Sequence, residues 1–86
     1  MAETAENRLK RLRMRSWRRG IKEMDLILGP YADTSLADLD SGQIAAYEAL
    51  LDENDQDLYA WFSGREPAPD RHRALIQTVL EGRTFR

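Results

Sequence analysis

The chain has 86 residues, enough for one small hydrophobic core and too few for separate substrate-binding and catalytic domains. Apolar residues make up 42% and charged residues 33%, a balance typical of a folded, helix-rich protein and not of a disordered one. Cysteine is absent and histidine occurs once, which excludes disulfides, thiolate catalysis and the common zinc sites. We therefore expect a single helical domain over residues 1–86 that is not an enzyme.

The net charge of −2 hides an uneven distribution of charge along the chain. No Lys or Arg occurs from residue 23 to residue 64, and most of the acids fall between residues 33 and 57. If folding keeps these segments apart, the domain carries one basic and one acidic face. Eight of the 13 basic residues lie within a short N-terminal segment: Arg8, Lys10, Arg11, Arg13, Arg15, Arg18, Arg19 and Lys22.

The first half of the chain predicts two helices. Residues 1–6 are small and acidic and are expected to fray. Residues 7–17 are good helix formers in which Leu9, Leu12 and Trp17 form a narrow apolar stripe. A second helix follows from Ile21, and Gly29-Pro30 is expected either to end it near Leu28 or to restart it.

The second half predicts a short helical turn followed by three helices. Ser35 and Asp38 have the spacing of a capping box, and Asp40 or Ser41 is expected to cap a helix that reaches about residue 53. Asn54 or Asp55 caps a short helix that ends at a left-handed Gly64. The last helix begins after a possible cap at Asp70, and Gly82 stops it. Since no segment alternates with a period of two, the expected fold is an all-α bundle of about five helices.

The sequence lacks the common motifs for metal binding, phosphate binding and catalysis. The acidic run at residues 52–57 lacks the central glycine and the closing glutamate of a calcium loop, and no glycine-rich phosphate loop is present. His72 is expected to be a surface or half-buried side chain without a catalytic role. No apolar run is long enough to span a membrane, and the acidic N-terminus differs from a signal peptide or presequence, so a cytoplasmic location is expected.

The stretch from Arg18 to Glu23 joins the basic helix to the next one. Gly20 has no Cβ, so another surface can approach its backbone closely. Arg19 and Glu23 are four residues apart, and on a continuous helix they would form an ordinary surface ion pair. Farther along the chain, Trp61 and Phe62 fit a core stripe, while Tyr59 points away from that stripe and is available to a partner.

Two functions remain open from the residues alone. The basic segment from Arg8 to Arg19 could contact the phosphates of RNA or DNA. Alternatively, the acidic middle of the chain could bind a basic protein, as in a toxin–antitoxin or regulatory pair.

Two segments together resemble a known family. Residues 18–29, Arg-Arg-Gly-Ile-Lys-Glu-Met-Asp-Leu-Ile-Leu-Gly, resemble the Arg-Gly-x-x-Glu signature of the small flavinylation factors that assist succinate dehydrogenase assembly. Residues 55–64, Asp-Gln-Asp-Leu-Tyr-Ala-Trp-Phe-Ser-Gly, resemble that family's second signature. The order of the two segments, their separation and the chain length also fit.

The resemblance implies an assembly factor. It would bind the flavoprotein subunit of succinate dehydrogenase, and of fumarate reductase, and promote covalent attachment of FAD to that subunit. FAD would belong to the partner, and this chain would hold no cofactor or metal and act as a monomer without nucleic acid. Arg19, Gly20 and Glu23 would form the centre of the contact. Its edge would include Arg18, Asp25, Asp57 and Tyr59.

Overall fold

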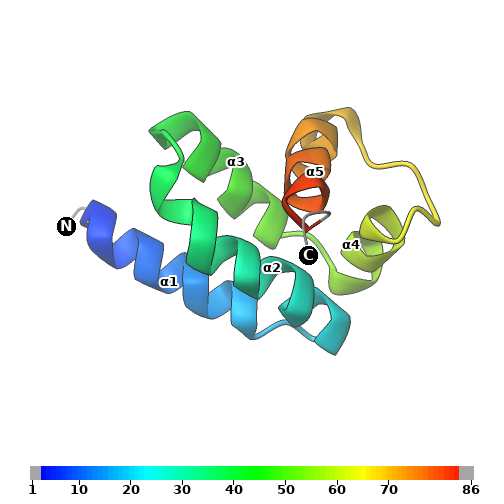
Figure 1. Cartoon of the computed structure of the whole chain (residues 1–86), viewed down its shortest axis with the longest axis horizontal. Coiled ribbons are helices and arrows are strands. Elements are labelled where there is room, and N and C mark those ends of the chain that lie inside the picture. The colour runs from blue at the N-terminus through cyan, green and yellow to red at the C-terminus, as the bar shows by residue number, and fades with distance from the viewer. Residues whose placement is uncertain (1–2, 84–86) are drawn as a thin grey trace.

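The computed structural model describes residues 3–83, with side chains described as far as Glu81. Its helices are α1 (Ala5–Trp17), α2 (Lys22–Ser35), a 3₁₀ turn η1 (Leu36–Asp38), α3 (Ser41–Leu51), α4 (Asp55–Phe62) and α5 (Asp70–Arg83) (Figure 1). No strand occurs in this described part of the chain. The all-α prediction of about five helices is confirmed, and the predicted short helical turn follows Ser35, but without the expected cap, because the Ser35 side chain makes no capping hydrogen bond.

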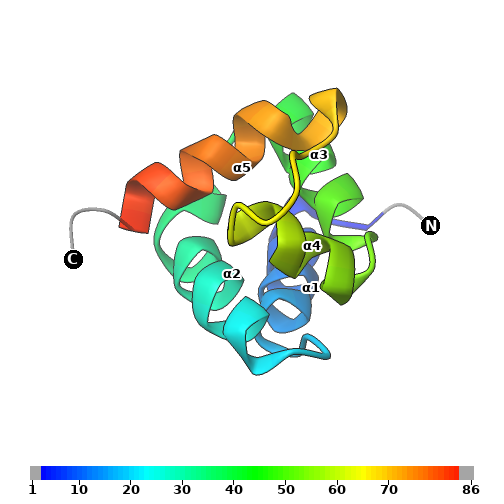
Figure 2. The same ribbon diagram turned by 90° about the vertical axis from the view of Figure 1, so that its right-hand side faces the viewer.

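Helices α1 and α2 pack side by side as an antiparallel pair, α4 and α5 pack on α2, and α3 packs on α1 and α5 (Figures 1 and 2). Figure 2 shows α5 crossing over the rest of the bundle. Each helix turns its apolar stripe inward, and each fully buried aliphatic side chain stabilises the fold by about 1.5–3 kcal/mol. The most deeply buried of these side chains are Leu12, Met24, Leu28, Leu36, Leu50, Leu51, Leu58 and Val79, with Tyr47 among them.

Local side-chain hydrogen bonds set the helix ends. Thr4 Oγ1 accepts a hydrogen bond from the Asn7 amide, so α1 begins at Ala5 and not at the predicted Asn7. Fraying of the N-terminal residues stays a prediction. Residues 1 and 2 lie outside the described residues. Of the two caps considered at each start, Asp40 caps α3, in a reciprocal capping box with Gln43, and Asn54 caps α4. Gly64 has a φ of 80°, as predicted. Gly82 does not stop α5, which reaches Arg83.

Helix α2 runs through Pro30, contrary to the expected break at Gly29-Pro30. Proline removes one hydrogen bond to the carbonyl four residues earlier, at the exposed Leu26, where water can replace it. The residues on both sides of Pro30, such as Leu28 and Tyr31, are buried in the core, and their packing outweighs that loss.

Trp17 does not join the α1 core stripe. Its side chain is 41% exposed and lies across α2, where the indole Nε1 donates to Asp33 at 3.1 Å. A Cβ built on Gly29 would lie 2.4 Å from the Trp17 ring. Gly29 is therefore required for close packing between α1 and α2 and does not act as a helix breaker.

Candidate partner-binding site

The loop between α1 and α2, residues 18–21, is held by a carboxylate from α4. Arg19 Nε donates to Asp55 Oδ1 at 2.8 Å, and the Gly20 amide donates to Asp55 Oδ2 at 2.7 Å. Arg19 Nη2 also donates to the Glu53 carbonyl at 3.3 Å, and the Arg19 side chain is only 8% exposed. Asp55 therefore joins the two sequence segments that carry the resemblance.

The same loop is fixed from α2 as well. The Arg19 amide donates to Asp25 Oδ1, which lies in the first turn of α2. A Cβ on Gly20 would lie 3.0 Å from Asp55 Oδ2, closer than ordinary van der Waals contact. The space left by the missing Cβ is thus occupied by a carboxylate of the chain itself, and it keeps Asp55 within hydrogen-bond distance of the Gly20 amide.

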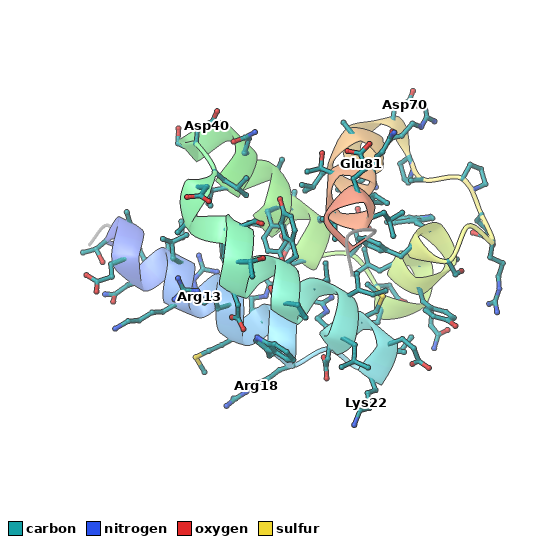
Figure 3. All side chains as sticks on the ribbon, in the orientation of Figure 1. Arg13, Arg18, Lys22, Asp40, Asp70 and Glu81 are labelled. Atoms are coloured by element: carbon teal, nitrogen blue, oxygen red, sulfur yellow. The ribbon has the colours of Figure 1, made fainter. Side chains whose placement is uncertain are left out.

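The expected ion pair between Arg19 and Glu23 does not form. Arg19 lies outside both helices, because the chain bends between Trp17 and Lys22, and its guanidinium faces Asp55. Glu23 is exposed in the first turn of α2, and no ion pair or hydrogen bond links its carboxylate to another described residue. Arg18 is exposed too, and Figure 3 shows Arg18 and Lys22 extending away from the helices.

The remaining predicted contact residues lie on α4. Asp57 is exposed, and Tyr59 is half-buried with the Arg65 guanidinium 5.7 Å from its ring centroid. No described hydrogen bond or ring contact joins either residue to the loop. Asp55 was not among the predicted site residues, although it opens the second signature segment. A carboxylate at the start of a helix is ordinarily explained by capping, so the sequence alone gave no reason to pair it with Arg19.

The basic and acidic segments pack against each other and do not form separate faces. The guanidinium groups of Arg8 and Arg11 both contact Glu48, at 2.9 Å each. Farther along, Arg15 Nη2 lies 2.9 Å from Asp52 Oδ1. With Arg19 and Asp55, these pairs follow the two segments in parallel order. Hydrogen bonds from Arg11 and Arg8 hold the pKa of the Glu48 carboxyl below its ordinary value.

His72 is buried, contrary to the expected surface or half-buried position. Its side chain is 3% exposed, Nε2 lies 2.7 Å from Glu53 Oε2, and the Trp61 ring centroid is 5.8 Å from that of the imidazole. The hydrogen bond to His72, with a second from Arg71, lowers the pKa of Glu53. Because the Glu53 carbonyl also accepts from Arg19, this pair connects α5 to the loop.

Within residues 3–81, no group of His, Cys, Asp or Glu side chains has a geometry that could hold a metal ion. A search of the same described residues finds no helix with the length and apolar character needed to cross a membrane.

Comparison with known proteins decides the family. Residues 10–82 match the family model described as flavinator of succinate dehydrogenase. The chain belongs to this family. The match spans both the Arg18–Gly20 loop and Asp55, the two parts that meet in space.

Curated relatives agree with the flavinator assignment. Each of the following is named succinate dehydrogenase assembly factor 2, mitochondrial. The protein of Drosophila grimshawi is 36% identical over 86% of this chain and 52% of its own length. That of Meyerozyma guilliermondii is 42% identical over 80% of this chain and 53% of its own length. That of Aspergillus terreus is 44% identical over 83% of this chain and 23% of its own length. The chain thus spans about half or less of the length of these relatives.

The names of these flavinator relatives contradict the cytoplasmic location expected for this chain, since they are mitochondrial proteins. That expectation depended on the composition of residues 1–6, which lie outside the residues matched by the family model. The nucleic-acid alternative finds no support in the comparisons. Four of the cations that would contact phosphates are instead paired with carboxylates of the chain itself: Arg8, Arg11, Arg15 and Arg19.

Proposed function

We propose that this chain is an assembly factor that binds the flavoprotein subunit of succinate dehydrogenase and promotes the covalent attachment of FAD to that subunit. Membership of the flavinator family supports this proposal. The structural observation behind it is the fixed loop at Arg19 and Gly20, which sets Glu23 in an exposed position with no described partner. A fixed, exposed carboxylate is suited to charge-assisted hydrogen bonding with another protein.

The residues of the expected contact divide into two roles in this proposal. Arg19, Gly20 and Asp25 hold the loop through bonds within the chain. Glu23 and Arg18 contact the flavoprotein, with Asp57 and Tyr59 at the edge of the contact. Arg19 therefore acts as a positioning residue, and Glu23 carries the recognition.

The mechanism is stabilisation of a reactive arrangement in the partner. FAD is bound by the flavoprotein, which supplies the attacking histidine, and this chain contributes no catalytic group. Favouring the aligned geometry of histidine and flavin by about 3 kcal/mol would accelerate attachment roughly a hundredfold. The flavoprotein subunit of fumarate reductase is a second client in this proposal, and the factor acts as a monomer.

The test is covalent flavin fluorescence of the flavoprotein subunit on denaturing gels, from cells with and without this chain. Deletion should remove most of the signal, wild type should restore it, and Glu23→Ala should not. Glu66→Ala is a matched control, because Glu66 is another exposed glutamate that lies in the loop between α4 and α5. Equal flavin content with and without the chain would refute the proposal.

Purified Glu23→Ala separates recognition from folding. The carboxylate of Glu23 interacts with the N-terminal end of the α2 dipole and with no described side chain, so its removal should lower the free energy of unfolding by less than about 1 kcal/mol. A larger loss on urea denaturation would make Glu23 a structural residue and remove it from the contact.

A further inference from the structure

The outer face of α1 carries an open hollow of about 510 Å³. Its lining comes from one face of α1 and from the first residues of the loop that follows: Asn7, Lys10, Arg11, Met14, Arg15, Arg18 and Arg19. None of the described residues that line it is acidic. The hollow ends at Arg18 and Arg19, where the loop of the proposed contact begins.

The cations of this hollow fall into two groups. Arg11, Arg15 and Arg19 are paired with carboxylates of the chain, which hold their guanidinium groups in place. The side chains of Lys10 and Arg18 are exposed and make no ion pair with any described residue. Between these two lies Met14, whose side chain is 52% exposed. The surface thus presents a cation, an apolar thioether and a second cation in a row.

We propose that this hollow binds an acidic segment of the flavoprotein subunit, with two carboxylates that contact Lys10 and Arg18 and an apolar side chain that packs on Met14. Arg18 directly follows the last residue of α1 and is eight positions after Lys10, so the carboxylates would lie about 12 Å apart at the helical rise per residue. The inference rests on the proposed function for the identity of the partner. It adds a second contact next to the loop, which would fix the orientation of the docked factor.

The structure favours an acidic protein segment over an anionic membrane. Trp17, the aromatic residue beside this face, lies against Gly29 and donates its indole N–H to the Asp33 carboxylate, so its ring is held on α2 and does not extend from this face as a membrane anchor. Lys10 and Arg18, the cations that make no ion pair with a described residue, are two separate positions, which suit isolated carboxylates of one segment better than a continuous anionic surface.

The test is the affinity of the purified full chain for the flavoprotein subunit, measured by calorimetry at low and high salt. Lys10→Glu should raise Kd about tenfold at low salt, and the difference should shrink as salt rises. Arg13→Glu reverses one charge on the same helix outside the hollow and should change Kd by less than about twofold. Met14→Ser should also weaken binding, with a loss that does not depend on salt.

The outcomes separate the inference from the proposed function. If wild type does not bind the flavoprotein, both fail. If wild type binds and Lys10→Glu binds equally well, only the hollow is refuted. Equal losses for Lys10→Glu and Arg13→Glu would indicate general electrostatic steering and overturn the inference. A membrane role would also overturn the inference. It would be shown if wild type binds phosphatidylglycerol vesicles, Lys10→Glu does not, and the two bind the flavoprotein with the same affinity.

Discussion

Removal of the Asp55 carboxylate is the sharpest perturbation of the loop. Asp55→Ala deletes both the acceptor for Arg19 Nε and the acceptor for the Gly20 amide. The Arg19 guanidinium then keeps one described contact, the Glu53 carbonyl at 3.3 Å. The variant therefore leaves a nearly buried cation without its counter-ion.

The expected loss of stability lies between two limits. Breaking a fully buried ion pair costs about 3–5 kcal/mol, and an exposed pair contributes at most about 1 kcal/mol. Arg19 is 8% exposed and Asp55 is 22% exposed, so water still reaches the carboxylate. We expect a loss of about 2 kcal/mol for Asp55→Ala, which corresponds to a fall in Tm of roughly 8–16 °C for a domain of this size.

A double-mutant cycle identifies the pair as the cause. Urea denaturation of wild type, Asp55→Ala, Arg19→Met and the double variant gives the coupling free energy between the two side chains. Because Arg19→Met removes the buried charge, loss of Asp55 should then cost about 1 kcal/mol or less. Glu23→Ala serves as a control that changes a carboxylate of the same region without breaking a described contact.

Two results would refute this reasoning. Additive effects in the cycle would mean that Arg19 and Asp55 do not stabilise each other. A variant Asp55→Asn that melts as wild type would mean that the charge is unimportant, because an amide keeps one acceptor oxygen and loses the ionic part of both bonds.

Three further predictions, two on substitutions and one on a titration, concern other contacts. Gly29→Ala should lower the stability of the protein, because the added methyl group displaces the Trp17 ring. In a Trp17→Ala background the same substitution should raise stability by up to about 1 kcal/mol. If thermal melting shows a loss in both backgrounds, Gly29 is not required for packing against Trp17. Hydrogen bonds to His72, the larger effect, and to Arg71 lower the pKa of Glu53. Wild type and Glu53→Gln should therefore differ in free energy of unfolding above pH 4.5, the ordinary pKa, and the difference should disappear as pH falls below that value. Circular dichroism measures both proteins, and a difference that stays constant with pH would contradict the prediction. Burial raises the pKa of Tyr47 to about 12, so the midpoint of its phenol ionisation in an ultraviolet titration of the folded protein should lie near that pH. A midpoint near the ordinary value of 10.0 would show that the ring is accessible.

The parts of the fold that follow from local chemistry could be predicted from the sequence. The cap at Asp40, the cap at Asn54 and the left-handed Gly64 each depend on residues within one helical turn; Gly64 was predicted outright, and each cap to within one of two adjacent residues. The course of α2 through Pro30 could not be predicted in this way, because it depends on how strongly Leu28 and Tyr31 pack in a core that local sequence does not describe.

The candidate site shows the same limit in another form. The resemblance gave the residues of the loop, but a spacing of four between Arg19 and Glu23 suggested the wrong ion pair. The true partner, Asp55, is 36 residues away. The burial of His72 against Glu53 likewise depends on where α5 crosses the bundle, which no local pattern of residues specifies.

The contacts between the two signature segments give each of the contacting residues a structural role. Arg19 and Gly20 both donate to Asp55, so the first segment is held in shape only if the second supplies a carboxylate at that position. Gly20 must lack a Cβ for its amide to reach that carboxylate, and Asp25 holds the same loop from the start of α2. Since these groups satisfy one another, little of their charge is left for a partner. In the proposed complex, recognition then falls to exposed neighbours such as Glu23 and Arg18, whose orientation depends on the fixed loop. It follows that loss of Asp55 should weaken binding of the flavoprotein without any contact of its own, and that raising the stability of Asp55→Asn by substitutions elsewhere should not restore that affinity.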